Sequence, residues 1–195
     1  MAQVELPAAL QDFEEGLDIV RDLAARDPGN AGWARDVSVS LNKVGDVRVA
    51  QGDLPAALQA FEESLSMRRD LAARDPGNAG WARDVSVSWE RVAGIAERQG
   101  DAKRAVDAWQ QALTISGTLA ERFPDSVDLQ TTPVVHLAGL ARLADVATAD
   151  GRAMAKEHLE RAVALLRPLA EAGTLDAQRA GWVGVIEGEL AKLDR

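Results

Sequence analysis

The sequence predicts an all-α protein in which about eight antiparallel helices stack in pairs as an α-solenoid. The first observation behind this prediction is an internal repeat, because residues 6–53 recur with substitutions as residues 54–101, at a constant offset of 54 − 6 = 48. A fixed period of about 20 to 50 residues is typical of stacked repeat arrays. The second observation is that apolar residues within each copy recur at steps of three and four, which is the spacing of one helix face. The third is a recurring Asp-Pro-Gly-Asn segment that separates two helical patterns in each copy.

The first helix of a copy has clear signals at both ends. Asp53 is placed to cap the helix, and Pro55 falls in the first turn, where a missing N–H costs nothing. The helix stops at the segment Asp75-Pro76-Gly77-Asn78, because Pro76 disfavours helical geometry in the residue before it. Arg68 interrupts the apolar pattern and is assigned to the outer side with two neighbours. The apolar face consists of Leu54, Ala57, Leu58, Phe61, Leu65, Leu71 and Ala72. The residues that interrupt it are Arg68, Arg69 and Asp70.

The second helix is less obvious, since the segment Asp-Val-Ser-Val-Ser alternates with a period of two and could be a strand. A wider window favours a helix from Gly32 to Gln51. Its apolar residues are spaced by 4, 4, 3 and 3: they are Trp33, Val37, Leu41, Val44 and Val47.

The later part of the chain follows the same pattern with more differences. Residues Ala105, Trp109, Leu113 and Leu119 stand 48 after Ala57, Phe61, Leu65 and Leu71. Pro133 falls inside the next expected helix, which should therefore either kink or start late, near Thr132. Beyond Gly151 the frame slips by about two residues, and Ala180-Gly181-Trp182 opens a last helix.

Composition excludes several classes of function. The 195 residues carry a net charge of −9, which argues against nucleic acid and against an anionic membrane surface. There is no cysteine, no apolar run of about 20 residues and no signal-peptide pattern at the N-terminus, so a cytoplasmic protein is expected.

Small and aromatic residues recur at fixed steps in these helices. The sets are Ala57, Phe61 and Ser64; Ala105, Trp109 and Ala112; and Ala155, Leu159 and Ala162; with Gly45, Ala93 and Ala141 in the preceding helices. This pattern resembles the tetratricopeptide repeat, particularly the long-helix variety of kinesin light chains and bacterial tandem arrays. The usual unit has about 34 residues, and the departure here is a longer period. The resemblance implies a right-handed superhelix whose concave face, lined by the helix that carries Gly45, binds a peptide or protein segment.

The resemblance implies one array over the whole chain. Its predicted parts are a partial repeat at 1–31, repeats at about 32–79, 80–127 and 128–175, and a terminal helix at 176–195. The expected function is a protein-protein interaction scaffold.

Candidate peptide-binding residues lie near the small positions, and each is otherwise a residue of a solvated helix face. They are Asn42, Lys43, Asp46, Trp89, Glu90, Arg91, Glu97, Arg98, Arg142 and Asp145. Trp33, Trp81 and Trp182 recur at helix starts and are assigned to packing between helices, and Trp109 is assigned to the core.

No residue set predicts catalysis, a metal or a cofactor. His136 and His158 lie on different predicted helices, without a partner at metal-ligand spacing. Adjacent carboxylates such as Glu62 and Glu63 point about 100° apart on a helix and cannot share a site. A pocket that collected His136, Asp145 and His158 would revive the enzyme hypothesis.

Both ends of the sequence match internal helices of the repeat. Ala2-Gln3 matches Ala50-Gln51, and Leu190 with Lys192 matches Leu41 with Lys43. Either the chain is a fragment of a longer array, or copies form homo-oligomers by stacking head to tail through these end helices, as heterologous contacts do.

Overall fold

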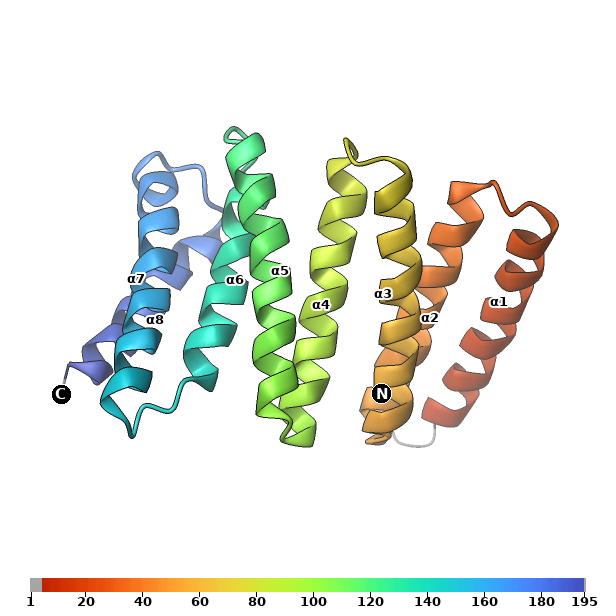
Figure 1. Ribbon diagram of the computed structural model, residues 1–195, viewed down its shortest axis with the longest axis horizontal. Coiled ribbons are helices and arrows are strands. Elements are labelled where there is room, and N and C mark those ends of the chain that lie inside the picture. Colours follow the sequence, from red (N-terminus) through yellow and green to blue (C-terminus); the bar gives the residue numbers. More distant parts are fainter. Residues whose placement is uncertain (1–4, 195) are drawn as a thin grey trace. The chain divides into compact units, whose positions relative to one another are not determined.

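A computed structural model describes residues 5–194, and within them the chain forms eight α-helices and no strand (Figure 1). The prediction of an all-α protein is therefore confirmed. The helices are α1 (Leu6–Arg26), α2 (Ala31–Gln51), α3 (Leu54–Arg74), α4 (Ala79–Gln99), α5 (Ala102–Arg122), α6 (Val127–Leu143), α7 (Ala149–Glu171) and α8 (Ala177–Leu193). The starts of α1, α3 and α5 are separated by 54 − 6 = 48 and 102 − 54 = 48 residues.

The chain divides into two compact units, and the boundary falls inside α5 rather than in a loop. Unit 1 is Met1–Ala105 and unit 2 is Val106–Arg195. In unit 1, α2 packs between α1 and α3, and α3 packs against α4. In unit 2, α7 packs against both α6 and α8.

The sequence Gly-Asp sets the sharp turn from an even to an odd helix. Gly52 follows α2 with φ 81°, a left-handed conformation that favours glycine. Its N–H donates to Val49 O, and the N–H of Asp53 donates to Arg48 O, so two terminal carbonyls of α2 are satisfied. The predicted cap of α3 is present, because Asp53 Oδ1 accepts from the N–H of Ala56 at 3.2 Å.

The Asp-Pro-Gly-Asn segment makes the turn from an odd to an even helix. Helix α1 ends at Arg26 and helix α3 at Arg74, each two residues before the proline. The asparagine then caps the next helix, since Asn30 Oδ1 accepts from the N–H of Gly32 at 2.9 Å and Asn78 Oδ1 from that of Trp81 at 3.1 Å. The alternating segment that could have been a strand lies inside α2, so the helical interpretation is confirmed.

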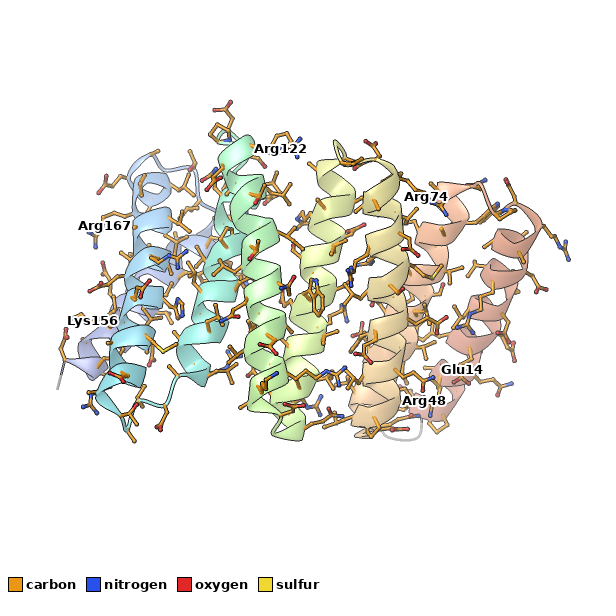
Figure 2. The ribbon with its side chains drawn as sticks, in the orientation of Figure 1. Glu14, Arg48, Arg74, Arg122, Lys156 and Arg167 are labelled. Carbon is orange, nitrogen blue, oxygen red and sulfur yellow. The ribbon has the colours of Figure 1, made fainter. Side chains whose placement is uncertain are left out.

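The core of unit 1 forms where an aromatic ring meets a position without a side chain. Phe61 on α3 is buried, and a Cβ atom added to Gly45 on α2 would lie 2.8 Å from its Cδ1 atom. Beside this contact, apolar residues of α1 and α2 form a cluster that includes Leu10, Leu17 and Leu41. At the surface, Arg48 Nη2 of α2 and Glu14 Oε1 of α1 lie 2.8 Å apart (Figure 2).

Unit 2 also packs an aromatic ring against a glycine of a neighbouring helix, and here the ring is a larger one. Trp109 on α5 is 5% exposed, so its assignment to the core is confirmed. A Cβ atom on Gly139 of α6 would lie 2.6 Å from the Cε2 atom of this indole. Helix α7 contributes Leu159 and Leu166 to the adjoining cluster, and α8 contributes Ile186.

Helix α6 begins earlier than one of the two sequence-based alternatives. It starts at Val127, where Ser126 Oγ accepts from the N–H of Leu129, and it continues through Pro133. The prediction of a late start near Thr132 is wrong, because a local cap fixes the first turn and the proline removes only one backbone donor.

Two further expectations from the sequence concern membrane-spanning helices and the N-terminal residues. No helix in the described part of the chain is long and apolar enough to cross a membrane. The match of Ala2-Gln3 to the end of α2 lies outside the described residues.

Gly45→Ala should lower the free energy of unfolding by about 1–3 kcal/mol, because the added Cβ overlaps a ring that is itself buried. Gly94→Ala is the matched control: this glycine lies inside α4, a Cβ there meets nothing within 4 Å, and the change should add up to about 1 kcal/mol. Urea unfolding followed by circular dichroism measures both. Equal midpoints for the two variants would contradict the close contact.

Candidate functional site

A seam of charged residues joins α2 and α4 in unit 1. We call this set, Arg35, Asn42 and Asp46 of α2 with Asp84 and Arg91 of α4, the α2/α4 seam. At one end, Arg35 Nε and Asp84 Oδ2 lie 3.7 Å apart, and at the other end Arg91 forms a close ion pair with Asp46. The structure thus brings together Asp46 and Arg91, two residues that the sequence proposed for peptide binding.

Asn42 lies one helical turn from Asp46 on the same face of α2. Its side chain is 7% exposed, and its Oδ1 atom is buried without a hydrogen-bond partner. Buried polar groups are nearly always paired, so this amide is an exception that calls for a physical explanation.

The candidates Lys43 and Arg91 each have a packing contact that the sequence analysis did not assign. Lys43 Nζ lies 5.6 Å from the centroid of the Phe13 ring, and the Arg91 guanidinium lies 5.2 Å from that of Phe61. Each cation stands 30 residues after its ring (43 − 13 = 91 − 61 = 30). The recurrence of this spacing in two copies could have indicated the cation–π contacts from the sequence.

A buried polar network lies beneath the seam. Arg68 of α3 is 8% exposed, donating from Nε to Ser38 Oγ at 3.2 Å and from Nη1 to Asp84 O at 3.0 Å and Ser88 Oγ at 3.1 Å. Burial lowers the pKa of Arg68, and the charge of Asp84 partly offsets this. The assignment of Arg68 to the outer side is wrong, because three acceptors on α2 and α4 satisfy its guanidinium inside the unit.

Unit 2 carries a different polar pair at the equivalent positions. Residues 48 after Arg68 and Ser88 are Ser116 and His136. Ser116 Oγ lies 2.9 Å from His136 Nδ1, and both side chains are fully buried. In unit 1 the longer side chain of the pair, Arg68, is on the odd-numbered helix α3, whereas in unit 2 the longer side chain, His136, is on the even-numbered helix α6. A polar contact between the two helices is present in both units.

An open groove lies between α6, α7 and α8 in unit 2, with a volume of about 640 Å³. We call it the α6/α8 groove. Its apolar lining includes Ala138 and Ala141 of α6, with Val185 and Ile186 of α8. Its charged lining residues are Arg142, Glu189 and Lys192. Arg142 was a sequence-based candidate; Val185, which is 64% exposed, and Lys192 were not.

The remaining candidates are scattered. Glu90 and Glu97 are half-buried on α4, and Arg98 is exposed near its end. Asp145 follows the end of α6, where its Oδ1 accepts from the N–H of Ala147 at 3.1 Å. Trp89 is half-buried and stands 48 residues from both Leu41 and Leu137, which are buried core residues.

The histidines do not assemble a catalytic or metal site with Asp145. His136 contacts Ser116 inside unit 2, Asp145 holds a loop, and half-buried His158 lies on α7. Among the described residues, no group of three or more His, Cys, Asp or Glu side chains is arranged to hold a metal ion.

Arg68→Ala should lower the free energy of unfolding by about 2–4 kcal/mol, since it removes three hydrogen bonds and leaves a cavity. Arg69→Ala is the control: the neighbouring arginine is exposed, and its loss should change stability by no more than about 0.5 kcal/mol. Chemical denaturation of both variants provides the comparison. A tolerated Arg68→Ala would show that the network contributes little.

His158 should make the protein less stable in mild acid. Burial lowers the pKa of His158 in the folded chain, nearby Arg161 lowers it further, and Glu157 partly offsets both. Because the unfolded histidine titrates near 6.5, it takes up its proton first as the pH falls, and stability declines from about pH 6.5 down to the lowered folded pKa. His158→Gln should lose less stability than the parent between about pH 7.5 and 5.5 in urea titrations. Parallel losses would refute this.

No family model matches the chain, and no curated protein sequence matches it. Among solved structures, BtubC (BKLC) from P. vanneervenii is similar, with 16% identity, a TM-score of 0.46, and 97% of this chain and 87% of that chain covered. The DHF119 filament has 18% identity and a TM-score of 0.41 over 97% and 95%. TTC0263, a thermophilic TPR protein in Thermus thermophilus, has 17% identity and a TM-score of 0.37 over 95% and 98%. No family assignment follows from these likenesses, and the fold class stands on the helices themselves.

Proposed function

We propose that this protein is a non-enzymatic interaction scaffold of the tetratricopeptide type, in which the even-numbered helices bind a segment of a partner protein. In this proposal the even helices carry the binding residues and the odd helices hold them in register. The repeats at 32–79, 80–127 and 128–175 are the structural units, and a location in the bacterial cytoplasm remains an expectation.

The observation that carries the proposal is the α6/α8 groove. An open groove of about 640 Å³ with apolar walls and a few charged residues has the character of a ligand site. Val185 and Val146, at 64% and 47% exposure, are two of its lining residues. Exposed apolar surface of this kind, rimmed by charge, favours a protein segment as the ligand.

Asn42 supports the same proposal in unit 1. A carboxamide offers one acceptor and two donors, which match the two hydrogen-bonding groups of a peptide backbone. Its Oδ1 atom has no partner within the described chain, and the residue lies on the same face as Asp46.

Self-assembly through the end helices is the alternative. It is favoured by the two most exposed large apolar side chains in the described residues, Ile19 of α1 at 62% and Val185 of α8 at 64%. Molar mass from light scattering over a wide concentration range tests it. A mass constant at 20.8 kDa would leave only the scaffold proposal.

Blocking the α6/α8 groove should abolish peptide binding. Randomised peptides displayed on phage are selected against the full chain, and enriched peptides are measured by fluorescence anisotropy. Ala138→Trp places an indole in the groove and should weaken binding by more than about tenfold, or about 1.4 kcal/mol.

Thr118→Trp is the control, because Thr118 lines a separate pocket of about 770 Å³ between α5, α6 and α7. Peptides whose binding survives Ala138→Trp, or a selection that enriches none, would overturn the proposal for this groove.

A further inference from the structure

A second opening of unit 2, separate from the α6/α8 groove, lies between α5, α6 and α7. We call it the α5/α7 pocket, and its volume is about 770 Å³. Its apolar lining includes Leu113 of α5, Pro133 and Leu137 of α6, and Leu165 of α7. A pocket of this size, with apolar walls and few polar groups, is typical of a small-molecule site.

Unit 1 has a smaller pocket, of about 350 Å³, at equivalent positions between α1, α2 and α3. Three lining residues of α5 stand 96 residues after three lining residues of α1: Leu113, Thr114 and Gly117 follow Leu17, Asp18 and Arg21. Helix α7 comes after the two-residue slip of the frame, so its offset from α3 is 96 + 2 = 98. Arg161 therefore takes the position of Glu63 (161 − 63 = 98).

An ion pair crosses the pocket of unit 1 and has no counterpart in unit 2. Arg21 Nη2 of α1 and Glu63 Oε1 of α3 lie 2.6 Å apart. In unit 2 the arginine is replaced by Gly117 and the glutamate by Arg161. A Cβ atom added to Gly117 would meet nothing within 4 Å, so no side chain fills the space beside it. The exchange leaves a larger opening with a cation in its lining.

Two charges of opposite sign line the α5/α7 pocket without pairing. Among the described residues, neither Arg161 nor Glu121 forms an ion pair or a side-chain hydrogen bond. Glu157, one helical turn before Arg161, does not pair with it either. The hydroxyls of Thr114 and Thr118 donate to backbone carbonyls of α5, at 2.9 and 3.0 Å. The charged groups that remain for a ligand are therefore Arg161 and Glu121.

The positions of these two charges match the ends of a short molecule. Arg161 lies opposite Gly117, because the equivalent residues of unit 1 form the ion pair. Glu121 stands 121 − 117 = 4 residues beyond Gly117 on α5, which is about 6 Å along the helix axis. A ligand that reaches both side chains needs a carboxylate and an ammonium group separated by an apolar body of about that length.

We propose that the α5/α7 pocket binds a small zwitterion, an amino acid whose amino and carboxylate groups stand at opposite ends of an apolar body. The carboxylate accepts hydrogen bonds from Arg161, and the ammonium group donates to Glu121. The apolar body packs on Leu113, Leu137 and Leu165. A ligand with a single charge would leave one of the two side chains without a partner. The inference concerns the odd-numbered helices and does not rest on the proposed function.

The probe is para-aminomethylbenzoate, whose ammonium and carboxylate groups lie at opposite ends of a phenyl ring. Its titration into the isotope-labelled full chain, followed by NMR, should give saturable shifts around Gly117 and Leu165 with a Kd of about 1 mM or below. Benzylamine and para-methylbenzoate each carry one of the two charges and should bind at least about fivefold more weakly. Shifts that do not saturate up to about 10 mM would overturn the inference.

Charge variants assign each end of the probe. Arg161→Gln should weaken binding of para-aminomethylbenzoate at least about fivefold and leave benzylamine unchanged, because benzylamine has no carboxylate. Glu121→Gln should likewise weaken the zwitterion and leave para-methylbenzoate unchanged. Arg167→Gln is the matched control, since this exposed arginine of α7 pairs with Glu187 and does not line the pocket. Equal effects of a variant on all three compounds would contradict the assigned contacts and overturn the inference.

Rebuilding the arrangement of unit 1 should close the pocket. The double variant Gly117→Arg with Arg161→Glu restores the charges of the ion pair and should abolish saturable binding, with helix content retained because arginine favours a helix more than glycine does. Thr118→Trp should have the same effect, whereas Ala138→Trp in the α6/α8 groove should have none. Undiminished binding in both pocket variants would overturn the inference, whatever the outcome for the proposed function. A dimer of the parent chain that the double variant dissociates would make a second copy the occupant, against the inference.

Discussion

The close approach of an aromatic ring to the neighbouring helix is the contact on which both units depend. Phe61 occupies the space that a side chain at position 45 would need, and Trp109 does the same at position 139. Rings of this size bury a large apolar area in a single contact, and their shape fixes how near two helix axes come. Where the ring is a phenylalanine, the residue 30 positions later is a cation that stacks on it. Where it is tryptophan, that residue is Gly139.

The helices could be predicted from the sequence because local and repeated signals agree. Asp53 and Asn78 cap the helices that follow them, Gly52 and Gly100 adopt the left-handed conformation of a turn, and Pro28 and Pro76 follow the ends of α1 and α3. The errors lie where a distant partner decides. Arg68 breaks the apolar pattern of α3, and only the serines of α2 and α4 show why it is buried. The start of α6 depends on Ser126, whose cap outweighs the proline six residues into the helix.

The candidate site could be predicted only in part. Asp46 and Arg91 were found because they flank the small positions of the repeat, and the structure joins them. The other residues of the candidate sites were harder to predict from the sequence. The α6/α8 groove also depends on Val185 and Lys192 of the last helix, where the sequence is shifted from the earlier copies.

Two similar copies in one chain can mispair during folding, since α1 or α3 could pack against the same neighbouring helices. Helices α1 and α3 differ at only a few positions, and one of them sets Val20 against Arg68. If α1 occupied the place of α3, Ser38 and Ser88 would face an aliphatic side chain, and the guanidinium would be stranded elsewhere without its three acceptors. The buried Arg68 therefore distinguishes α3 from α1. It lowers the stability of the swapped arrangement more than it raises the stability of the native one.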